Sequence, residues 1–188
     1  MNGAEIIIKK IEDGRNKNKP LIIAIDGRCA AGKTSFAECV ARKTGVSVVH
    51  MDDFFLQPFQ RTEERLKTPG GNADRERFER EVLVPLSKGE QARFFPFDCH
   101  SLTFKDAVSV NGSNGVIVEG SYCCHPELWH FYDVHIFMDV DKSTQLERIK
   151  ARNGADGLKV FEEKWIPLEE EYFSAYDLMN RCDYCFKT

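Results

Sequence analysis

Runs of apolar residues divide the chain into segments with two alternating patterns. Four stretches are rich in Ile, Val, Leu and Met and are typical of strands buried on both faces of a sheet: residues 21–25, 46–51, 116–118 and 134–140. Four others place apolar residues at helical spacing: residues 6–11, 35–41, 74–87 and 141–152. Buried strands that alternate with helices predict an α/β fold with a parallel sheet covered on both faces. The run at 134–140 is expected to be the last strand of this core.

The segments outside these runs predict less regular structure. Residues 56–72 are loop-like because prolines and glycines recur in them. Residues 93–98 indicate an exposed strand or the arm of a hairpin. After residue 152 the pattern favours helix, over residues 158–165 and 167–180.

Residues 27–34 read GRCAAGKT and match GxxxxGK[ST], the phosphate-binding P-loop. A buried strand before the motif and a helix after it are the context that it requires. Glycine at positions 27 and 32 lets the loop turn its N–H groups around a phosphate, and the helix dipole adds positive potential. Lys33 is predicted to reach the β- and γ-phosphates of a nucleotide, and the Thr34 hydroxyl to bind Mg²⁺. The predicted nucleotide contacts are Gly27, Ala30, Ala31, Gly32, Lys33, Thr34 and Ser35.

Acidic residues follow two of the predicted strands. Asp52 comes directly after the run at 46–51, and Glu119 follows the run at 116–118. Ligands of parallel sheets bind beyond the carboxyl ends of the strands, so both carboxylates are expected to face the P-loop. A carboxylate there can bind a metal ion or take a proton from an attacking hydroxyl.

Arg148 and Arg152 lie four residues apart on the predicted helix and therefore share one face. Over a phosphate site, two guanidinium groups would offset the charge that develops during phosphoryl transfer. The alternative is a solvated basic face paired with an acid such as Glu147. Because a P-loop lies upstream, the pair favours a lid, and the sequence NGADG at 153–157 suits a lid that moves.

Composition and charge limit the classes of protein to consider. The 188 residues are 42% hydrophobic and 30% charged, as in a globular protein with a core. A net charge of −4 gives no support for a nucleic-acid partner. The sequence has no apolar run of membrane-spanning length and no signal-peptide pattern, so we expect no membrane partner. Seven scattered cysteines beside a P-loop indicate reduced thiols and a cytoplasmic location, and the lone CxxC at 182–185 does not by itself make a zinc site.

Together these motifs resemble the uridine kinase-like group of P-loop kinases, which also contains pantothenate kinase and phosphoribulokinase. The resemblance covers roughly residues 20–155. It rests on five stretches: residues 25–34, 51–55 (MDDFF), 96–98 (PFD), 118–120 (VEG) and the arginines at 148 and 152. It implies a three-layer α/β/α P-loop fold with five parallel strands in the order 2-3-1-4-5. It also implies one kinase domain over residues 1–188, with an acceptor-binding insertion near 56–105 and a helical lid near 148–160.

The resemblance further implies roles for single residues. Asp52 would accept the proton of an acceptor hydroxyl and would join Thr34 and Glu119 around Mg²⁺. Three basic residues would stabilise the transferring phosphoryl group of ATP: Lys33, Arg148 and Arg152. The implied acceptor contacts are Asp52, Phe55, Phe97, Asp98, His100 and Tyr122.

The predicted activity is ATP-dependent phosphorylation of a hydroxyl group on a small molecule, with a nucleoside as the favoured acceptor. Phe55 and Phe97 stand where uridine kinases carry tyrosines, so the predicted acceptor pocket loses two hydroxyls. Pantothenate, nicotinamide riboside and a sugar phosphate are therefore alternative acceptors. The sugar phosphate gains from the basic residues of the same segment: Arg61, Arg65, Lys67 and Arg77. A nucleotide-binding module without catalysis is the remaining alternative, and the sequence leaves homo-oligomerisation open.

Overall fold

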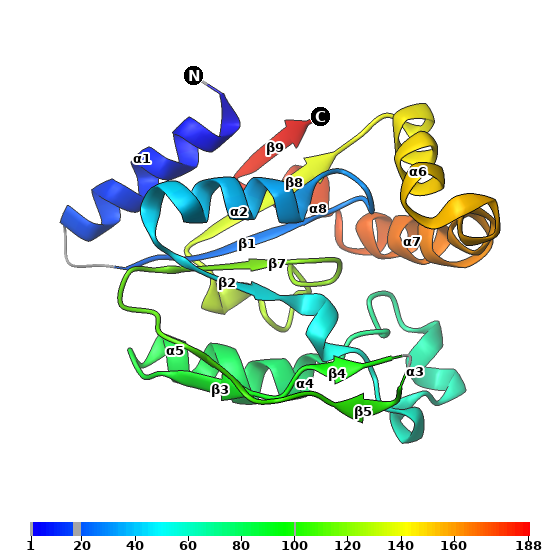
Figure 1. Ribbon diagram of the computed structural model, residues 1–188, viewed down its shortest axis with the longest axis horizontal. Helices are drawn as coiled ribbons and strands as arrows, with labels where there is room; N and C mark the ends of the chain where they lie inside the picture. Colours follow the sequence, from blue (N-terminus) through cyan, green and yellow to red (C-terminus); the bar gives the residue numbers. More distant parts are fainter. Residues whose placement is uncertain (1, 17–19, 100) are drawn as a thin grey trace.

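The computed structural model describes residues 2–16, 20–99 and 101–188, and a sheet of five parallel strands forms its centre (Figure 1). From one edge to the other, the strands are β2 (Ser47–His50), β7 (Val116–Glu119), β1 (Ile22–Gly27), β8 (Val134–Asp139) and β9 (Tyr184–Lys187). Numbered along the chain, this order is 2-3-1-4-5. The predicted α/β class, the parallel sheet and its strand order are confirmed.

Strand β1 is buried because it lies between two neighbours and under helices on both faces. It pairs in parallel with β7 and with β8. Ile23 and Ile25 pack into one hydrophobic cluster, and Ala24 between them packs into the other. Successive side chains point to opposite faces of a strand, and here both faces are covered. This explains why residues 21–25 show an unbroken apolar run.

Helices α1 (Gly3–Asn16) and α2 (Lys33–Thr44) cover one face of the sheet (Figure 1). Ile7 and Ile11 lie one turn apart on α1, and both are buried against this face. Helix α2 is followed by Gly45, which has a φ of 70° and whose N–H donates to the carbonyl oxygen of Ala41 in the last turn.

The opposite face is covered by the C-terminal helices and by the segment between β2 and β7. Tyr172 and Phe173, on helix α7 (Ile166–Tyr176), are buried there. The Phe173 ring meets that of Phe137 of β8 edge to face, with centroids 5.0 Å apart. Helix α8 (Leu178–Arg181) follows, and the short helix η4 (Trp129–Phe131) precedes β8.

The segment between β2 and β7 gathers below the sheet in Figure 1. It begins with the 3-10 helix η1 (Met51–Phe54). The predicted helix over 74–87 is confirmed as three continuous parts: α4 (Arg75–Phe78), the π-helical η3 (Glu79–Leu83) and α5 (Val84–Ser87). The Asp74 carboxylate caps it by accepting the N–H of Arg77 at 3.2 Å.

Residues 56–72 are more ordered than the loop that their prolines and glycines predict. They contain the 3-10 helix η2 (Pro58–Gln60) and the helix α3 (Glu63–Lys67). The Thr62 hydroxyl caps α3 by accepting the N–H of Arg65 at 3.2 Å. Capping of these short helices by threonine and glutamine side chains therefore outweighs the tendency of the prolines and glycines to form turns.

The strand expected near 93–98 is two short hairpin arms. Strand β3 (Ala92–Phe94) pairs with β6 (Val108–Val110), and β4 (Phe97–Asp98) pairs with β5 (Thr103–Phe104). Both pairings are antiparallel, and all four strands lie outside the main sheet. Phe94 and Phe97 are buried, so the arms expose only part of their surface.

The prediction that residues 134–140 form the last core strand is wrong, because β9 pairs with β8 beyond them. Along β9 the side chains alternate between half-buried and exposed. Tyr184 and Phe186 pack on the core, while Cys185 and Lys187 face outward. An edge strand of four residues with one solvent-exposed face lacks the continuous apolar run that is typical of the inner strands.

Helix α6 (Lys142–Val160) runs past the end expected near residue 152. Gly154 breaks its geometry with φ 73° and ψ −176°, so the predicted break is a kink within the helix. The π-helical η5 (Phe161–Trp165) then leads into α7. Among the described residues, no helix combines the length and apolar character needed to cross a membrane.

Candidate functional site

The P-loop connects β1 to α2 and needs glycine at both glycine positions of its motif, 27 and 32, for steric reasons. Gly27 has a φ of 126°, and a Cβ there would lie 2.2 Å from the carbonyl oxygen of Met138 on β8. Gly32 has a φ of 84° with open space around it. The first glycine therefore permits a close approach of two strands, and the second permits the left-handed turn into the helix.

Lys33 and Thr34 open helix α2 at the mouth of this loop. The Lys33 amine donates to the carbonyl oxygens of Gly27 at 2.7 Å and Arg28 at 2.9 Å, and the side chain is only 9% exposed. The Thr34 hydroxyl donates to Oε1 of Glu119 at 3.2 Å. A hydroxyl beside a carboxylate is a donor set that suits Mg²⁺, which prefers oxygen ligands.

The two predicted strand-end acids lie at the same edge of the sheet, because β2 and β7 are parallel neighbours. His50 and Glu119 are register partners, and His50 Nδ1 lies 2.5 Å from Glu119 Oε1. That hydrogen bond raises the pKa of His50 above its ordinary value. Asp52 follows two residues later, in η1.

The Asp52 carboxylate opens into a cavity and is accessible to water there, yet protein atoms surround it on most sides. This burial raises the pKa of Asp52, while the positive charge of Lys33 acts in the opposite direction. Asp52 and Lys33 therefore line the same cavity.

The cavity has a volume of about 1140 Å³ and lies between three parts of the chain. The P-loop and the start of α2 form one wall, and residues from η1 to Ala73 form the facing wall. Side chains of α6, η5 and α7 close the third side. This volume exceeds that of most small-ligand pockets, so it has room for a nucleotide together with a second small molecule.

The two predicted lid arginines both line the cavity. Arg148 donates to the carbonyl oxygen of Ala30 at 3.1 Å and to the hydroxyl of Thr188 at 3.0 Å. Arg152 bonds to the side chain of Asn153 at 2.8 Å and lies over the ring of Phe161. Arg148 therefore contacts the P-loop itself, whereas Arg152 lies one turn farther along the helix.

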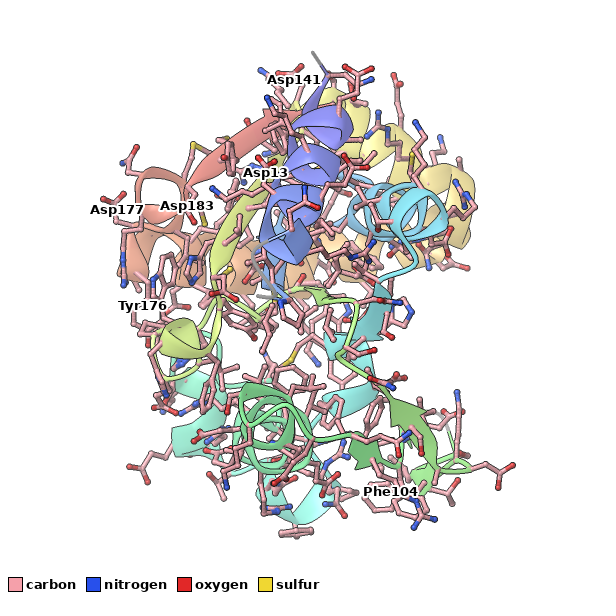
Figure 2. All side chains as sticks on the ribbon, turned by 90° about the vertical axis from the view of Figure 1, so that its left-hand side faces the viewer. Asp13, Phe104, Asp141, Tyr176, Asp177 and Asp183 are labelled. Carbon is pink, nitrogen blue, oxygen red and sulfur yellow. The ribbon has the colours of Figure 1, made fainter. Side chains whose placement is uncertain are left out.

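The predicted acceptor contacts separate into two groups. Asp52, Phe55 and Tyr122 line the cavity. Phe97 does not line it and packs on Phe104, which lies at the end of the molecule opposite α1 (Figure 2).

Asp98 also does not line the cavity, and its carboxylate lies 3.5 Å from Lys105 Nζ. His100 lies outside the described residues. The acceptor roles of Phe97, Asp98 and His100 stay predictions.

Tyr122 is held in the cavity wall by an unusual backbone. Its φ of 75° is rare for a residue with a side chain, and such strain recurs at functional sites. Its N–H donates to Asp26 at 3.3 Å. Its ring meets that of Tyr172 edge to face at 5.0 Å.

Asp26, in β1 directly before the P-loop, is a buried residue for which no role was predicted from the sequence. It is fully buried, and its two oxygens accept hydrogen bonds from the N–H groups of Gly27, Tyr122 and Cys124 and from the hydroxyl of Tyr172. Burial raises the pKa of Asp26 to about 6, and these donors oppose the shift. One carboxylate thus joins β1, the loop after β7 and helix α7.

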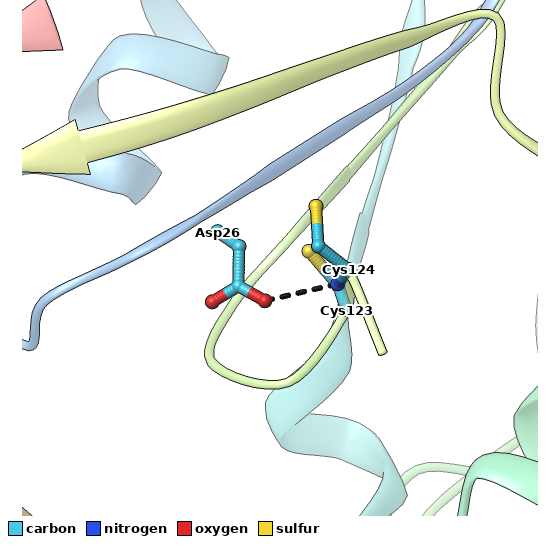
Figure 3. A group of neighbouring side chains, drawn as sticks. All are labelled: Asp26, Cys123 and Cys124. Atoms are coloured by element: carbon cyan, nitrogen blue, oxygen red, sulfur yellow. Dashed lines mark hydrogen bonds between the residues drawn. The ribbon is translucent and has the colours of Figure 1, made fainter. Parts of the chain in front are cut away.

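The thiols of Cys123 and Cys124 lie beside the Asp26 carboxylate (Figure 3). These three side chains each offer a potential metal-ligand atom, and the three atoms lie within 4.8 Å of one another. The Asp26 oxygens already accept four hydrogen bonds, which occupy the lone pairs that a metal would need. Burial raises the pKa of Cys123 to about 11, which disfavours the thiolate form that binds metals. This group is therefore a structural contact.

Glu169 and Gln145 hold the P-loop from outside the motif. Oε2 of Glu169 accepts the N–H of Cys29 at 2.9 Å, and Oε1 accepts the hydroxyl of Ser121 at 2.6 Å. Gln145 donates to the carbonyl oxygen of Cys29 at 3.0 Å. Both side chains are at most 5% exposed. Their separation from Cys29 by more than 110 residues in sequence left no local pattern to detect.

No family model matches the chain. Two solved structures resemble it over nearly their full lengths. A possible uridine kinase from Bacillus stearothermophilus is 21% identical, with 97% of this chain and 96% of that chain covered and a TM-score of 0.72. YFH7 from Saccharomyces cerevisiae, a candidate P-loop containing kinase with a circular permutation, is 11% identical, with 100% and 99% covered and a TM-score of 0.68. At these identities the similarity shows the fold, and the chain has the fold of P-loop kinases.

Proposed function

We propose that this protein transfers the γ-phosphoryl group of ATP to a hydroxyl group of a small molecule. The observation that carries the proposal is that Lys33 of the P-loop and the carboxylate of Asp52 face one cavity with room for two ligands. The similarity to a structure described as a possible uridine kinase supports a nucleoside as the first acceptor to test. Pantothenate and nicotinamide riboside are the alternatives.

In the proposed reaction, the acceptor oxygen bonds to the γ-phosphorus while the bond from phosphorus to the bridging oxygen of ADP breaks. Asp52 takes the proton that the hydroxyl loses, and its raised pKa makes it a better base. Lys33 leaves its two backbone carbonyls to bind the phosphates, and the two lid arginines offset the charge of the transferring group.

Thr34 and Glu119 are the residues that would hold Mg²⁺, with Asp52 nearby. Bound there, the metal would neutralise phosphate charge and orient the oxygens for in-line transfer. Glu119 already carries two contacts, from the Thr34 hydroxyl and from His50, which fix the direction of its carboxylate. The Glu119 carboxylate is therefore oriented before any ligand binds.

The test is transfer from ATP and Mg²⁺ to uridine, cytidine, pantothenate and nicotinamide riboside, with Asp52→Asn and Asp53→Asn compared. Asp53 is the matched neighbour because its side chain does not line the cavity. Asp52→Asn is expected to lower kcat by about 10²–10⁴, the range for a positioned base. Full activity of Asp52→Asn would exclude it as the base, and ATP binding without transfer to any hydroxyl acceptor would contradict the proposed function.

A further inference from the structure

The basic residues that favour a sugar phosphate as acceptor are Arg61, Arg65, Lys67 and Arg77, and three of these four are committed to structural contacts. Arg65 lies 2.6 Å from a carboxylate oxygen of Glu76. Lys67 pairs with Glu63 one turn away on the exposed face of α3. The guanidinium of Arg77 lies between the carboxylates of Asp74 and Glu81, and its side chain is 6% exposed. These three charges are balanced by neighbouring acids.

Arg61 differs from them. Its Nε and Nη2 both donate to the carbonyl oxygen of Leu56, at 3.1 and 3.0 Å. Within the described part of the chain, no carboxylate pairs with it, and it lines the cavity. The bond to Leu56 fixes the direction of the guanidinium and leaves Nη1 as a donor toward a ligand.

Lys164 of η5 provides a second such charge on the third side of the cavity. Its amine lies 4.4 Å from the centre of the Trp165 ring, and that ring is 6.5 Å from the ring of Phe55. Phe55 is the direct neighbour of Leu56, to which Arg61 bonds. Arg61 and Lys164 therefore come from two different segments of the chain, and both line the cavity. No acid pairs with Lys164 among the residues that the structure describes.

The acids of the cavity do not compensate these charges. Glu119 faces Thr34 and His50, and Glu169 is bound to Cys29 and Ser121. Asp52 forms no salt bridge with Arg61 in the described structure. Arg61 and the proposed base Asp52 therefore both line the cavity without pairing with each other in the described structure.

We propose that the acceptor carries an anionic group, a carboxylate or a phosphate, which Arg61 binds while the acceptor hydroxyl faces Asp52. Lys164 supplies the second positive charge from the third side of the cavity. This inference rests on the proposed kinase function and narrows its acceptor class. An anion satisfies two cations that neighbouring acids leave unbalanced, and charged hydrogen bonds are the stronger kind.

The test measures binding separately from turnover. Calorimetry with a non-hydrolysable ATP analogue and Mg²⁺ present would compare three matched pairs of probes. These are pantothenate with pantothenol, nicotinic acid riboside with nicotinamide riboside, and ribose 5-phosphate with ribose. The first two pairs report a carboxylate and the third reports a phosphate. Each pair is measured on the natural sequence, Arg61→Gln, Arg61→Lys and Lys67→Gln, the last removing a charge from the same segment away from the cavity.

The natural protein is expected to prefer the member that carries the carboxylate or phosphate in at least one pair, by about 10-fold or more. Arg61→Gln should remove most of that preference, with little change for the member that lacks the anionic group, as expected for a charged hydrogen bond. Arg61→Lys should restore part of it, and Lys67→Gln should leave it unchanged. No preference in any pair, or a preference that survives Arg61→Gln, would overturn the inference. Phosphorylation of uridine or another uncharged acceptor in a separate transfer assay with ATP and Mg²⁺ would leave the proposed function standing.

Discussion

Residues 27–34, on the P-loop side of the cavity, take their shape from backbone geometry, whereas residues 51–73, on the facing side, take theirs from arginine side chains. In the P-loop, Gly27 is required by the nearness of β8 and Gly32 by a positive φ. On the facing side, arginines donate to backbone carbonyl oxygens of the segment: Arg61 to Leu56, Arg65 to Gly71 and Ala73, and Arg77 to Asp53. The glycines of the P-loop belong to a short sequence motif, whereas the arginine contacts of the facing side follow no motif.

Because the two sides of the cavity are held by different contacts, we expect that substitutions can alter each side independently. A substitution in the P-loop is expected to alter transfer while leaving the facing wall intact. A substitution in the facing wall is expected to alter which acceptor binds while leaving the P-loop intact. The predictions below test this separation in order of decreasing effect.

Lys33→Ala is expected to have the largest effect, a loss of phosphoryl transfer of at least about 10³-fold. The lysine charge acts on the phosphates, and water cannot replace it within a preorganised site. Binding of the anionic probes should change little, because Lys33 is on the P-loop side. Steady-state transfer and calorimetry on the same sample measure both quantities. Equal loss of transfer and of probe binding would show that the two sides are coupled.

Asp26→Asn is expected to lower the free energy of unfolding by about 2–4 kcal/mol, because an amide nitrogen would face hydrogen-bond donors in a fully buried position. With a pKa of about 6, Asp26 is ionised at neutral pH and accepts all four bonds. Urea denaturation gives the value. Asp13→Asn is the control, since Asp13 lies exposed on α1 (Figure 2). A loss no greater than that of the control would mean that the Asp26 contacts contribute little.

His125 is expected to make the stability of the folded protein sensitive to acid. Burial and the charge of Arg75 lower the pKa of His125 to about 4, while an unfolded histidine titrates near 6.5. Between these pH values the unfolded chain binds a proton that the folded chain does not. The contribution of His125 is therefore present above about pH 6.5 and is lost as pH falls toward 4.

The measurement is the free energy of unfolding of the natural protein and of His125→Gln from pH 7 to pH 4.5. The natural protein should lose about 1–2 kcal/mol more than the variant across this range. Asp26 changes stability in the opposite direction over similar pH values, so only the difference between the two proteins isolates His125. His130→Gln, at an exposed histidine, is the control. Parallel curves for all three would exclude His125 as the acid-sensitive group.

Much of the fold could be predicted from the sequence because its inner strands are buried on both faces. Such strands must be apolar throughout, and residues 21–25 show this directly. The edge strand β9 has one face in solvent, so its four residues carry no comparable pattern. The remaining differences, such as the ordered residues 56–72, arise from capping contacts a few residues apart.

The candidate site divides in the same way. Lys33, Thr34, Asp52 and Glu119 follow strand ends or a motif, and the topology of a parallel sheet brings strand ends together. Glu169 reaches the P-loop from a helix that no motif connects to it. Only tertiary packing makes that contact, so sequence patterns alone did not predict it.

The hydrogen bond between Glu169 and the Cys29 N–H can be used to measure how often helix α7 separates from the P-loop. That amide is protected by a side chain of α7, so its exchange with deuterated solvent measures how often α7 separates from the loop. The thiol of the same residue is 8% exposed, and its pKa is raised to about 12, so alkylating reagents should spare it while the contact holds. Mass spectrometry of Cys29 labelling, with and without nucleotide, would therefore report how often helix α7 separates from the P-loop.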